Sequence, residues 1–320
     1  MLVVECDGMQ MMKITRRCKY GWGLAVVLAI AVLGQVPVLA DEILNDTEDG
    51  PHPVLNFPPV LEIAGAQLYR DASHDSEGSP AEGLTVRRGQ HVLLRLRAYR
   101  FELNYRAKVS GAGPDAIVTA WTGGAHCCFT IHALWLAHDF RQQVIPVLDN
   151  DEAGFLPDER RPDAPPKLRF GDFTFAYWRA SFADSPAPTV IFRLNPPTGR
   201  YAPDIEAMRK PVPDDAALST MARDIRDAEQ NLQKGDTPPA PLLWKDMLDL
   251  IYSGNAPAAR RLFDLAWPES RKGKDEFLAC FTEKLSKGIW WRSEKLGRLL
   301  DAESVFRVSA TMPKDCVSEE

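Results

Sequence analysis

The sequence predicts an α+β fold in which strands and helices occupy separate segments of the chain. We expect an N-terminal antiparallel all-β meander, sandwich or propeller-like, followed by a C-terminal all-α helical domain. Two patterns lead to this prediction: β-branched runs alternate with turn residues over residues 61–210, and helical periodicity with cap residues begins after Pro213. The length of 320 residues and the 45% hydrophobic content suit a globular chain of two domains.

The first forty residues predict a secretory signal peptide. A basic start over residues 13–19 precedes an apolar run over residues 24–33, which is too short to span a bilayer as a helix. Small residues then lead to Ala40, so we expect cleavage after Ala40 and a periplasmic or secreted protein without a membrane span. An uncleaved membrane anchor is the rival interpretation. Residues 41–60 form an irregular lead-in, rich in Asp, Pro and Asn.

Charge and cysteine content argue against a nucleic-acid-binding protein and favour one with disulfide bonds. Removing residues 1–40 takes four of the 38 Lys and Arg and two of the 44 Asp and Glu, which leaves a formal charge of −8. That acidic balance argues against nucleic acid as a partner, because such binding rests on neutralising phosphates. Four cysteines remain after cleavage, and an even number in an oxidising compartment favours disulfides. They are Cys127, Cys128, Cys280 and Cys316.

Turn residues between β-branched or aromatic runs predict four hairpins in the β-rich segment. The glycines at these turns accept backbone conformations that other residues avoid. The hairpins are residues 84–96 around Gly89, residues 116–121 with 128–136 across Gly123 and Gly124, residues 168–170 with 173–178 around Gly171 and Asp172, and residues 189–194 with 200–201 around residues 195–199.

Helix signals begin at residue 211. Asp214 is expected to cap a helix that runs to about Lys234 and ends at Gly235, so residues 211–237 are a helix and a linker. The helical domain follows over residues 238–320. It should contain a helical hairpin of residues 242–252 and 257–267, then helices over residues 274–286 and 289–300.

The stretch from Gly123 to Trp135, GGAHCCFTIHALW, offers possible metal ligands. On a strand, Cys127, Phe129, Ile131 and Ala133 share an apolar face that should meet the core, whereas His126, Cys128, Thr130 and His132 share the other face. Imidazole and thiolate suit zinc or copper. His126 and His132 would lie roughly 20 Å apart along an extended strand, so His126 with Cys128 is the credible pair.

Disulfide bonds are the alternative use of these cysteines. We favour Cys127 with Cys128, together with Cys280 with Cys316. The second bond would close a loop of about 37 residues, worth roughly 4 kcal/mol in the chain-entropy model. A bond from Cys127 or Cys128 to the C-terminal pair, or two buried thiols, are the other possibilities.

A resemblance rests on residues 114–118 followed by Trp121-Thr122-Gly123-Gly124 and Ala125-His126-Cys127-Cys128. This stretch resembles uncharacterised bacterial secreted proteins with a GGAHCC motif, which are distantly similar to FG-GAP and VCBS β-propeller repeats. The resemblance covers roughly residues 110–205, where Phe175-Ala176-Tyr177-Trp178 is also similar. It implies a small β-meander with turns that can bind calcium, and no established activity. Residues 111–115 keep a single acid where calcium-binding turns carry three or more.

Two further patterns predict ligands. Asp149 and Asp151 match the opening of a calcium loop and Asp158 could add a ligand, although a solvated acidic loop explains them more simply. A group of arginines could recognise an anionic glycan or the other domain, or form the solvent face of a hairpin. They are Arg87, Arg88, Arg95, Arg97, Arg100 and Arg106.

The helical hairpin resembles one tetratricopeptide unit, with Ala259, Phe263 and Ala266 at its small and aromatic packing positions. The usual enzyme motifs are absent from the sequence. We therefore expect a non-catalytic, exported cell-envelope protein that binds a protein or glycan partner and needs no cofactor. The alternative is a metal-binding or thiol-redox protein centred on His126, Cys127 and Cys128.

Overall fold

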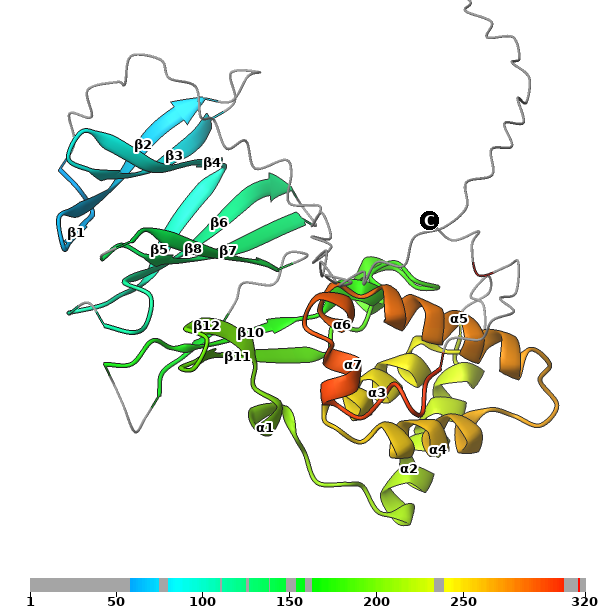
Figure 1. Cartoon of the computed structure of the whole chain (residues 1–320). Coiled ribbons are helices and arrows are strands. Elements are labelled where there is room, and N and C mark those ends of the chain that lie inside the picture. The colour runs from blue at the N-terminus through cyan, green and yellow to red at the C-terminus, as the bar shows by residue number, and fades with distance from the viewer. Residues whose placement is uncertain are drawn as a thin grey trace, which may run out of the picture. The chain divides into compact units, whose positions relative to one another are not determined.

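Three antiparallel sheets of four strands form the N-terminal part of the protein, and helices form the C-terminal part, as Figure 1 shows. The mixed α+β prediction is confirmed. The structure is a computed structural model. It describes residues 58–74, 80–109, 111–124, 127–137, 139–147, 154–158, 163–232, 239–307 and 316, all within the compact unit Ala40–Glu320. In these ranges no helix has the length and apolar content that a membrane span requires.

Sheet 1 is a meander of four strands in chain order. The predicted hairpin around Gly89 is confirmed, since Arg88 pairs with His91 across a turn in which Gly89 has φ 60°. The strands are β1 (Leu61–Ile63), β2 (Ala66–His74), β3 (Pro80–Arg88) and β4 (His91–Ala98).

Sheet 2 is a second meander in chain order, and it contains the cysteine motif. The predicted hairpin across Gly123 and Gly124 is confirmed, with Trp121 opposite Phe129 and Gly124 opposite Cys127. The strands are β5 (Arg100–Arg106), β6 (Ala116–Gly124), β7 (Cys127–Trp135) and β8 (Arg141–Val147).

Sheet 3 has the order β12-β11-β10-β9. Its strands are β9 (Gly154–Leu156), β10 (Lys167–Gly171), β11 (Thr189–Asn195) and β12 (Arg200–Pro203). The predicted β11–β12 hairpin is confirmed. The predicted pairing of residues 168–170 with 173–178 is wrong, because β10 pairs with β11 and β9 instead. Asp172 caps a short 3₁₀ helix, Phe173–Phe175, by accepting the Thr174 N–H, and so turns the chain away from the sheet.

The second helix begins where capping predicts. The Asp214 carboxylate accepts the Ala217 N–H at 2.8 Å and starts the second helix. The helix expected over residues 289–300 is two short helices, because Lys295 adopts a left-handed backbone with φ 53°. The helices are α1 (Ile205–Met208), α2 (Asp215–Gln230), α3 (Pro241–Tyr252), α4 (Ala256–Ala266), α5 (Lys274–Lys287), α6 (Ile289–Ser293) and α7 (Leu296–Leu299).

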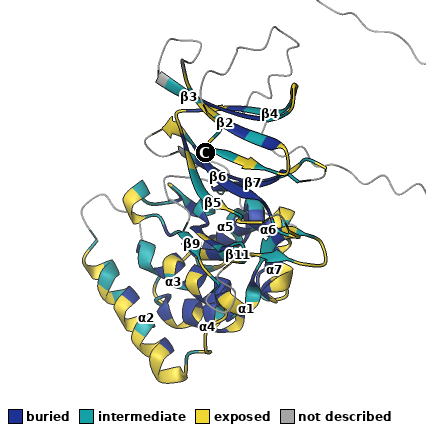
Figure 2. Ribbon diagram, turned by 90° about the vertical axis from the view of Figure 1, so that its left-hand side faces the viewer, coloured by how far each residue is buried: buried dark blue, intermediate teal, exposed yellow. Residues whose placement is uncertain are grey.

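Helix α2 is amphipathic. Leu218, Ala222 and Ile225 are buried at spacings of four and three residues, while the opposite side is exposed, as the yellow outer face of α2 in Figure 2 shows. That stripe packs chiefly against α4.

Two apolar clusters fill the interior, and sheet 2 contributes to both. One face of sheet 2, with Val118 and Leu134, packs with sheet 1 residues such as Leu84. The other face, with Ile117 and Ile131, belongs to a larger cluster. That larger cluster also contains Phe170 and Phe192 of sheet 3 and Trp244, Phe281 and Trp290 of the helices. The strands of sheet 3 and the helices therefore share one core.

Candidate functional site

The tip of the β6–β7 hairpin carries the cysteine motif. Pairing shifts register between Trp121 and Gly124, and the Thr122 hydroxyl accepts the Cys128 N–H at 2.8 Å. Irregularities of this kind bend a hairpin and re-aim its side chains. The two connecting residues, Ala125 and the predicted ligand His126, lie outside the described residues.

An aromatic cluster surrounds this tip. Trp121 contacts Tyr99 edge-on with 5.0 Å between ring centroids, and it stacks on Phe129 at 6.0 Å. The Arg100 guanidinium lies 5.3 Å from the Trp121 ring centroid, in cation–π range. Phe129 is buried, whereas the Tyr99 side chain is 51% exposed. The cluster therefore has a buried base and an open, partly cationic surface.

Gly123 allows the Tyr99 ring of this cluster to pack against the hairpin backbone. Its φ of 94° is unfavourable for any residue with a Cβ. A Cβ there would also lie 3.0 Å from Tyr99 Cγ, so the Tyr99 ring rests directly on the glycine backbone. The junction between β4 and β5, where Tyr99 lies, is thereby fixed against the hairpin tip.

Cys128 is disulfide-bonded. Since Cys280 and Cys316 are bonded to each other, the partner of Cys128 is one of Cys6, Cys18 and Cys127, whose side chains lie outside the described residues. The bond between Cys127 and Cys128 stays a prediction. A disulfide sulfur is not a thiolate, so zinc or copper binding by His126 and Cys128 is a prediction for the reduced form.

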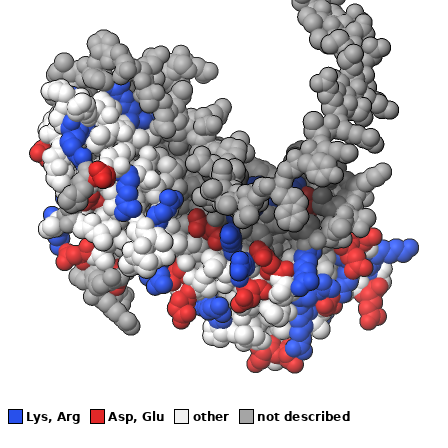
Figure 3. Space-filling model, in the orientation of Figure 1, with Lys and Arg blue, Asp and Glu red and all other residues white. Residues whose placement is uncertain are grey.

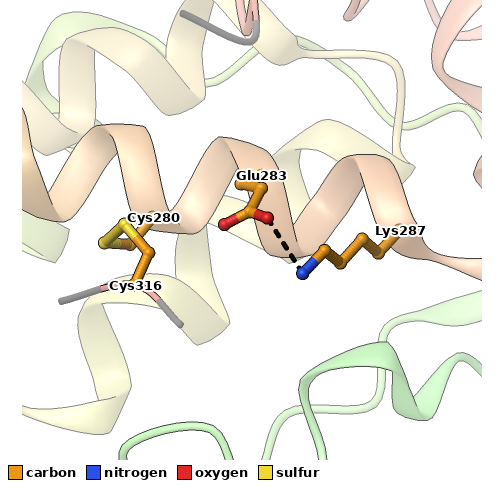
Figure 4. Close-up of a disulfide and its surroundings, with 4 residues drawn as sticks. All are labelled: Cys280, Glu283, Lys287 and Cys316. Carbon is orange, nitrogen blue, oxygen red and sulfur yellow. Dashed lines mark ion pairs between the residues drawn. A yellow bond between two sulfur atoms is a disulfide. The ribbon is translucent and has the colours of Figure 1, made fainter. Parts of the chain in front are cut away.

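The predicted Cys280–Cys316 disulfide is confirmed, with Cα atoms 5.2 Å apart and a separation of 36 residues (Figure 4). Cys280 is buried on α5. One helical turn beyond it, Glu283 pairs with Lys287 at 2.9 Å. The disulfide links residue 316 to helix α5. It therefore uses neither Cys127 nor Cys128 of the hairpin.

His132 is buried in the middle of β7. The Gln142 amide nitrogen lies 2.6 Å from its Nδ1, which fits an amide donating to a neutral imidazole. Burial lowers the pKa of His132 to about 4. The apolar face expected for Phe129, Ile131 and Ala133 is confirmed, but the opposite face with Thr130 and His132 is buried as well, because sheet 1 covers it.

The calcium hypothesis receives no test from the described residues. Asp149 and Asp151 lie outside them, and Asp158 follows β9. Within the described part of the chain, no three His, Cys, Asp or Glu side chains gather as a metal site. The single acid of the calcium-like turn, Asp115, accepts the backbone N–H groups of Leu136 and Ala137 at 2.7 and 2.9 Å. Its carboxylate therefore fastens the end of β7.

Two arginines of the β part, Arg87 and Arg88, make separate contacts. Arg88 donates to the Leu136 carbonyl at 2.5 Å, and Arg87 donates to Gln90 at 3.2 Å. In Figure 3 basic side chains are spread singly over the strands, whereas acidic and basic ones lie side by side over the helices. Recognition of an anionic glycan by the whole group stays a prediction.

Sequence patterns did not predict the Tyr99–Trp121 contact, because Tyr99 lies at the β4–β5 junction and Trp121 lies on β6, with no motif that joins them. The only local signal was the glycine pair, which marks a place where backbone and ring approach closely. No family model, curated protein or solved structure matches this chain. The similarity to FG-GAP and VCBS repeats accordingly stays a prediction.

Proposed function

We propose that this chain is an exported, non-catalytic binding protein of the cell envelope, whose recognition surface is the aromatic cluster at the hairpin tip. The observation that supports it best is the exposed Tyr99 ring held on Trp121 beside Arg100. Tyr, Trp and Arg are the residue types that dominate binding energy at interfaces. Because Gly123 and Phe129 fix the cluster from below, little side-chain freedom would be lost on binding a protein or glycan partner.

Export is supported by the disulfides. The Cys280–Cys316 bond and the disulfide state of Cys128 suit an oxidising compartment, where such bonds persist. Cleavage after Ala40 would deliver a mature chain that begins at Asp41.

A propeller-like arrangement of the β part belongs to the same proposal. Each sheet is a four-stranded meander of neighbouring strands, as in a propeller blade, and sheet 2 packs on both sides. Three such sheets would form an open stack of blade-like units, which leaves the hairpin tips at strand ends accessible to a partner.

A photo-crosslinking amino acid at position 99 tests the recognition surface in cells. We expect a discrete adduct of defined mass that disappears when Trp121→Leu removes the ring beneath position 99. The matched control carries the same crosslinker at Arg106, which is exposed on β5 but outside the cluster. Equal adducts from both positions, or none from position 99, would contradict the proposal.

Sequencing the N-terminus of the exported form tests cleavage, with Asp41 expected first.

A thiol-redox or metal-binding protein is the second candidate, favoured by the disulfide state of Cys128 beside the predicted ligand His126. Thiol titration of the unfolded mature protein separates the two candidates. A structural staple predicts no free thiols before reduction and four afterwards. Two free thiols with stoichiometric zinc or copper in native mass spectra would instead support the second candidate.

A further inference from the structure

A second aromatic surface lies between β10 and β11, in a segment with two 3₁₀ helices, Phe173–Phe175 and Phe182–Asp184. Three of its rings form a ladder. Phe173 stacks on Phe182 with 5.9 Å between centroids and 10° between planes, and Phe182 contacts Tyr177 at 5.5 Å. Tyr177 stands at the open end of the ladder and is 56% exposed.

The backbone beneath this ladder is strained. Tyr177 and Arg179 have φ values of 58° and 55°, in the left-handed region that residues with a Cβ avoid. Trp178 between them is buried, edge-on against Phe175 at 5.1 Å and against Trp244 at 5.4 Å. The two left-handed residues thus direct Trp178 into the core and Tyr177 towards solvent.

Burial of Trp178 explains why the backbone is left-handed on both sides of it. It does not explain why a tyrosine occupies position 177. A glycine would adopt this φ without strain, yet the chain places a large exposed ring there. Strained residues persist where surrounding contacts hold them, and they gather at sites that grip a ligand. An exposed ring at a strained position therefore fits a binding role for its outward surface.

Polar groups at the edge of the ladder limit the kind of ligand. The Ser181 hydroxyl donates to Asp184 Oδ2 at 2.7 Å, and the Ser185 hydroxyl accepts the Tyr177 N–H at 2.9 Å. Asp184 is exposed, and a carboxylate has about four acceptor positions, so sites remain for further donors. The rim accepts hydrogen bonds beside an apolar ring surface.

We infer that this ladder is a binding site for a neutral saccharide. The C–H face of a pyranose ring would lie on Tyr177 at the open end of the ladder, and its hydroxyls would donate to Asp184. A proline-rich peptide presents mainly carbonyl acceptors and, because proline has no N–H, few backbone donors for a carboxylate rim. An acidic glycan would meet the like charge of Asp184. The site is separate from the hairpin tip and does not depend on export.

Titration calorimetry of the mature chain against neutral hexasaccharides, including β-1,4-linked glucose and β-1,4-linked N-acetylglucosamine, tests the site. We expect saturable binding to at least one of them, weakened at least tenfold by Tyr177→Ala and several-fold by Asp184→Asn. Leu299→Ala is the control, since it removes another large side chain that is 44% exposed and lies outside both aromatic surfaces, and it should leave the affinity unchanged. Loss of saccharide binding while the crosslinked adduct at position 99 persists would be a failure of this site and not of the hairpin surface.

No Tyr177-dependent binding to any neutral saccharide would overturn the inference, and so would Tyr177-dependent binding of a proline-rich peptide in its place. Tyr177→Gly guards against misfolding as an explanation. Because glycine relieves the strain at φ 58°, this variant should melt no lower than Tyr177→Ala while losing the saccharide equally. A glycine variant that melts far below wild type yet keeps full saccharide affinity would make the ring purely structural.

Discussion

The side-chain amide of Gln143 exchanges two hydrogen bonds with the backbone of Tyr201. Its Nε2 donates to the Tyr201 carbonyl at 2.9 Å, and its Oε1 accepts the Tyr201 N–H at 2.7 Å. β12 is an edge strand of sheet 3, so these backbone groups face away from its one ladder partner, β11. A side chain from β8 of sheet 2 thus satisfies an edge that would otherwise offer pairing to another chain.

Gln143→Leu should lower the free energy of unfolding by about 1–3 kcal/mol, because it leaves two buried backbone groups without partners. Gln143→Glu should fall between wild type and Gln143→Leu, since a carboxylate can accept the N–H but cannot donate to the carbonyl. Urea denaturation measures both. Gln90→Leu on the exposed β3–β4 turn is the control, and an equal loss there would refute a special role for Gln143.

Acid should destabilise the protein through His132. Its pKa is about 4 when folded and 6.5 when unfolded, so the unfolded chain binds the extra proton between those values. Stability is full above pH 6.5 and falls by up to about 3 kcal/mol as the pH drops to 4. Denaturation midpoints across this range should flatten in His132→Leu but not in His91→Gln, a control on an exposed histidine. An unchanged slope in His132→Leu would contradict this assignment.

Loss of the Cys280–Cys316 bond should cost up to about 4 kcal/mol, the loop-closure value for a separation of 36 residues. Cys316→Ser is the informative variant, because it leaves Cys280 in its buried position. Thermal unfolding under oxidising conditions measures the loss. Reductant also breaks the disulfide of Cys128, so it should lower the melting temperature of Cys316→Ser as well. If reductant leaves the melting temperature of Cys316→Ser unchanged, the Cys128 disulfide does not stabilise the fold.

Gly123→Ala should destabilise the hairpin tip by about 1–2 kcal/mol, because alanine is strained at φ 94°. The added methyl group would also press on the Tyr99 ring. Gly111→Ala is the matched control, since a Cβ there has no atom within 4 Å. Chemical denaturation compares the two, and Tyr99 should gain solvent exposure only in the Gly123 variant.

Tyr252→Phe should cost about 1.5–3 kcal/mol, since the Tyr252 hydroxyl donates to the buried Asp172 carboxylate at 2.6 Å. Burial and the nearby Asp172 carboxylate raise the pKa of Tyr252 well above its usual range, so the hydroxyl stays a donor at every pH the fold survives. Tyr99→Phe provides an exposed comparison in the same denaturation experiment. Equal stabilities of the two variants would disprove the role of this bond.

Local signals in the sequence predicted the local structure well. The hairpins at Gly89, at Gly123 and at residues 195–199 are confirmed because a turn and its flanking runs are neighbours in the chain. The pairing of residues 173–178 failed, since aromatic residues there serve as anchors against the helices and not as a strand. Strand alternation also carried no information about His132, because sheet 2 is covered on both faces.

The candidate surfaces depend on contacts that no local pattern encodes. Tyr99 meets Trp121 across a strand junction, and Gln143 meets Tyr201 across 58 residues. The disulfide between Cys280 and Cys316 could be predicted only because the expected export would limit how four cysteines are used. Sequence patterns placed Tyr177 in a predicted strand and in the stretch that carries the family resemblance, whereas its left-handed backbone is visible only in three dimensions.

Trp290 contacts both Phe170 and Phe192, at 5.4 and 5.0 Å between ring centroids. Because the chain is made from its N-terminus, Phe170 and Phe192 are synthesised about a hundred residues before Trp290. Sheets 1 and 2 can close their shared cluster from residues 66–136 alone. The cluster that contains sheet 3 is complete only after the last third of the chain has been made, because Trp290 of α6 belongs to it.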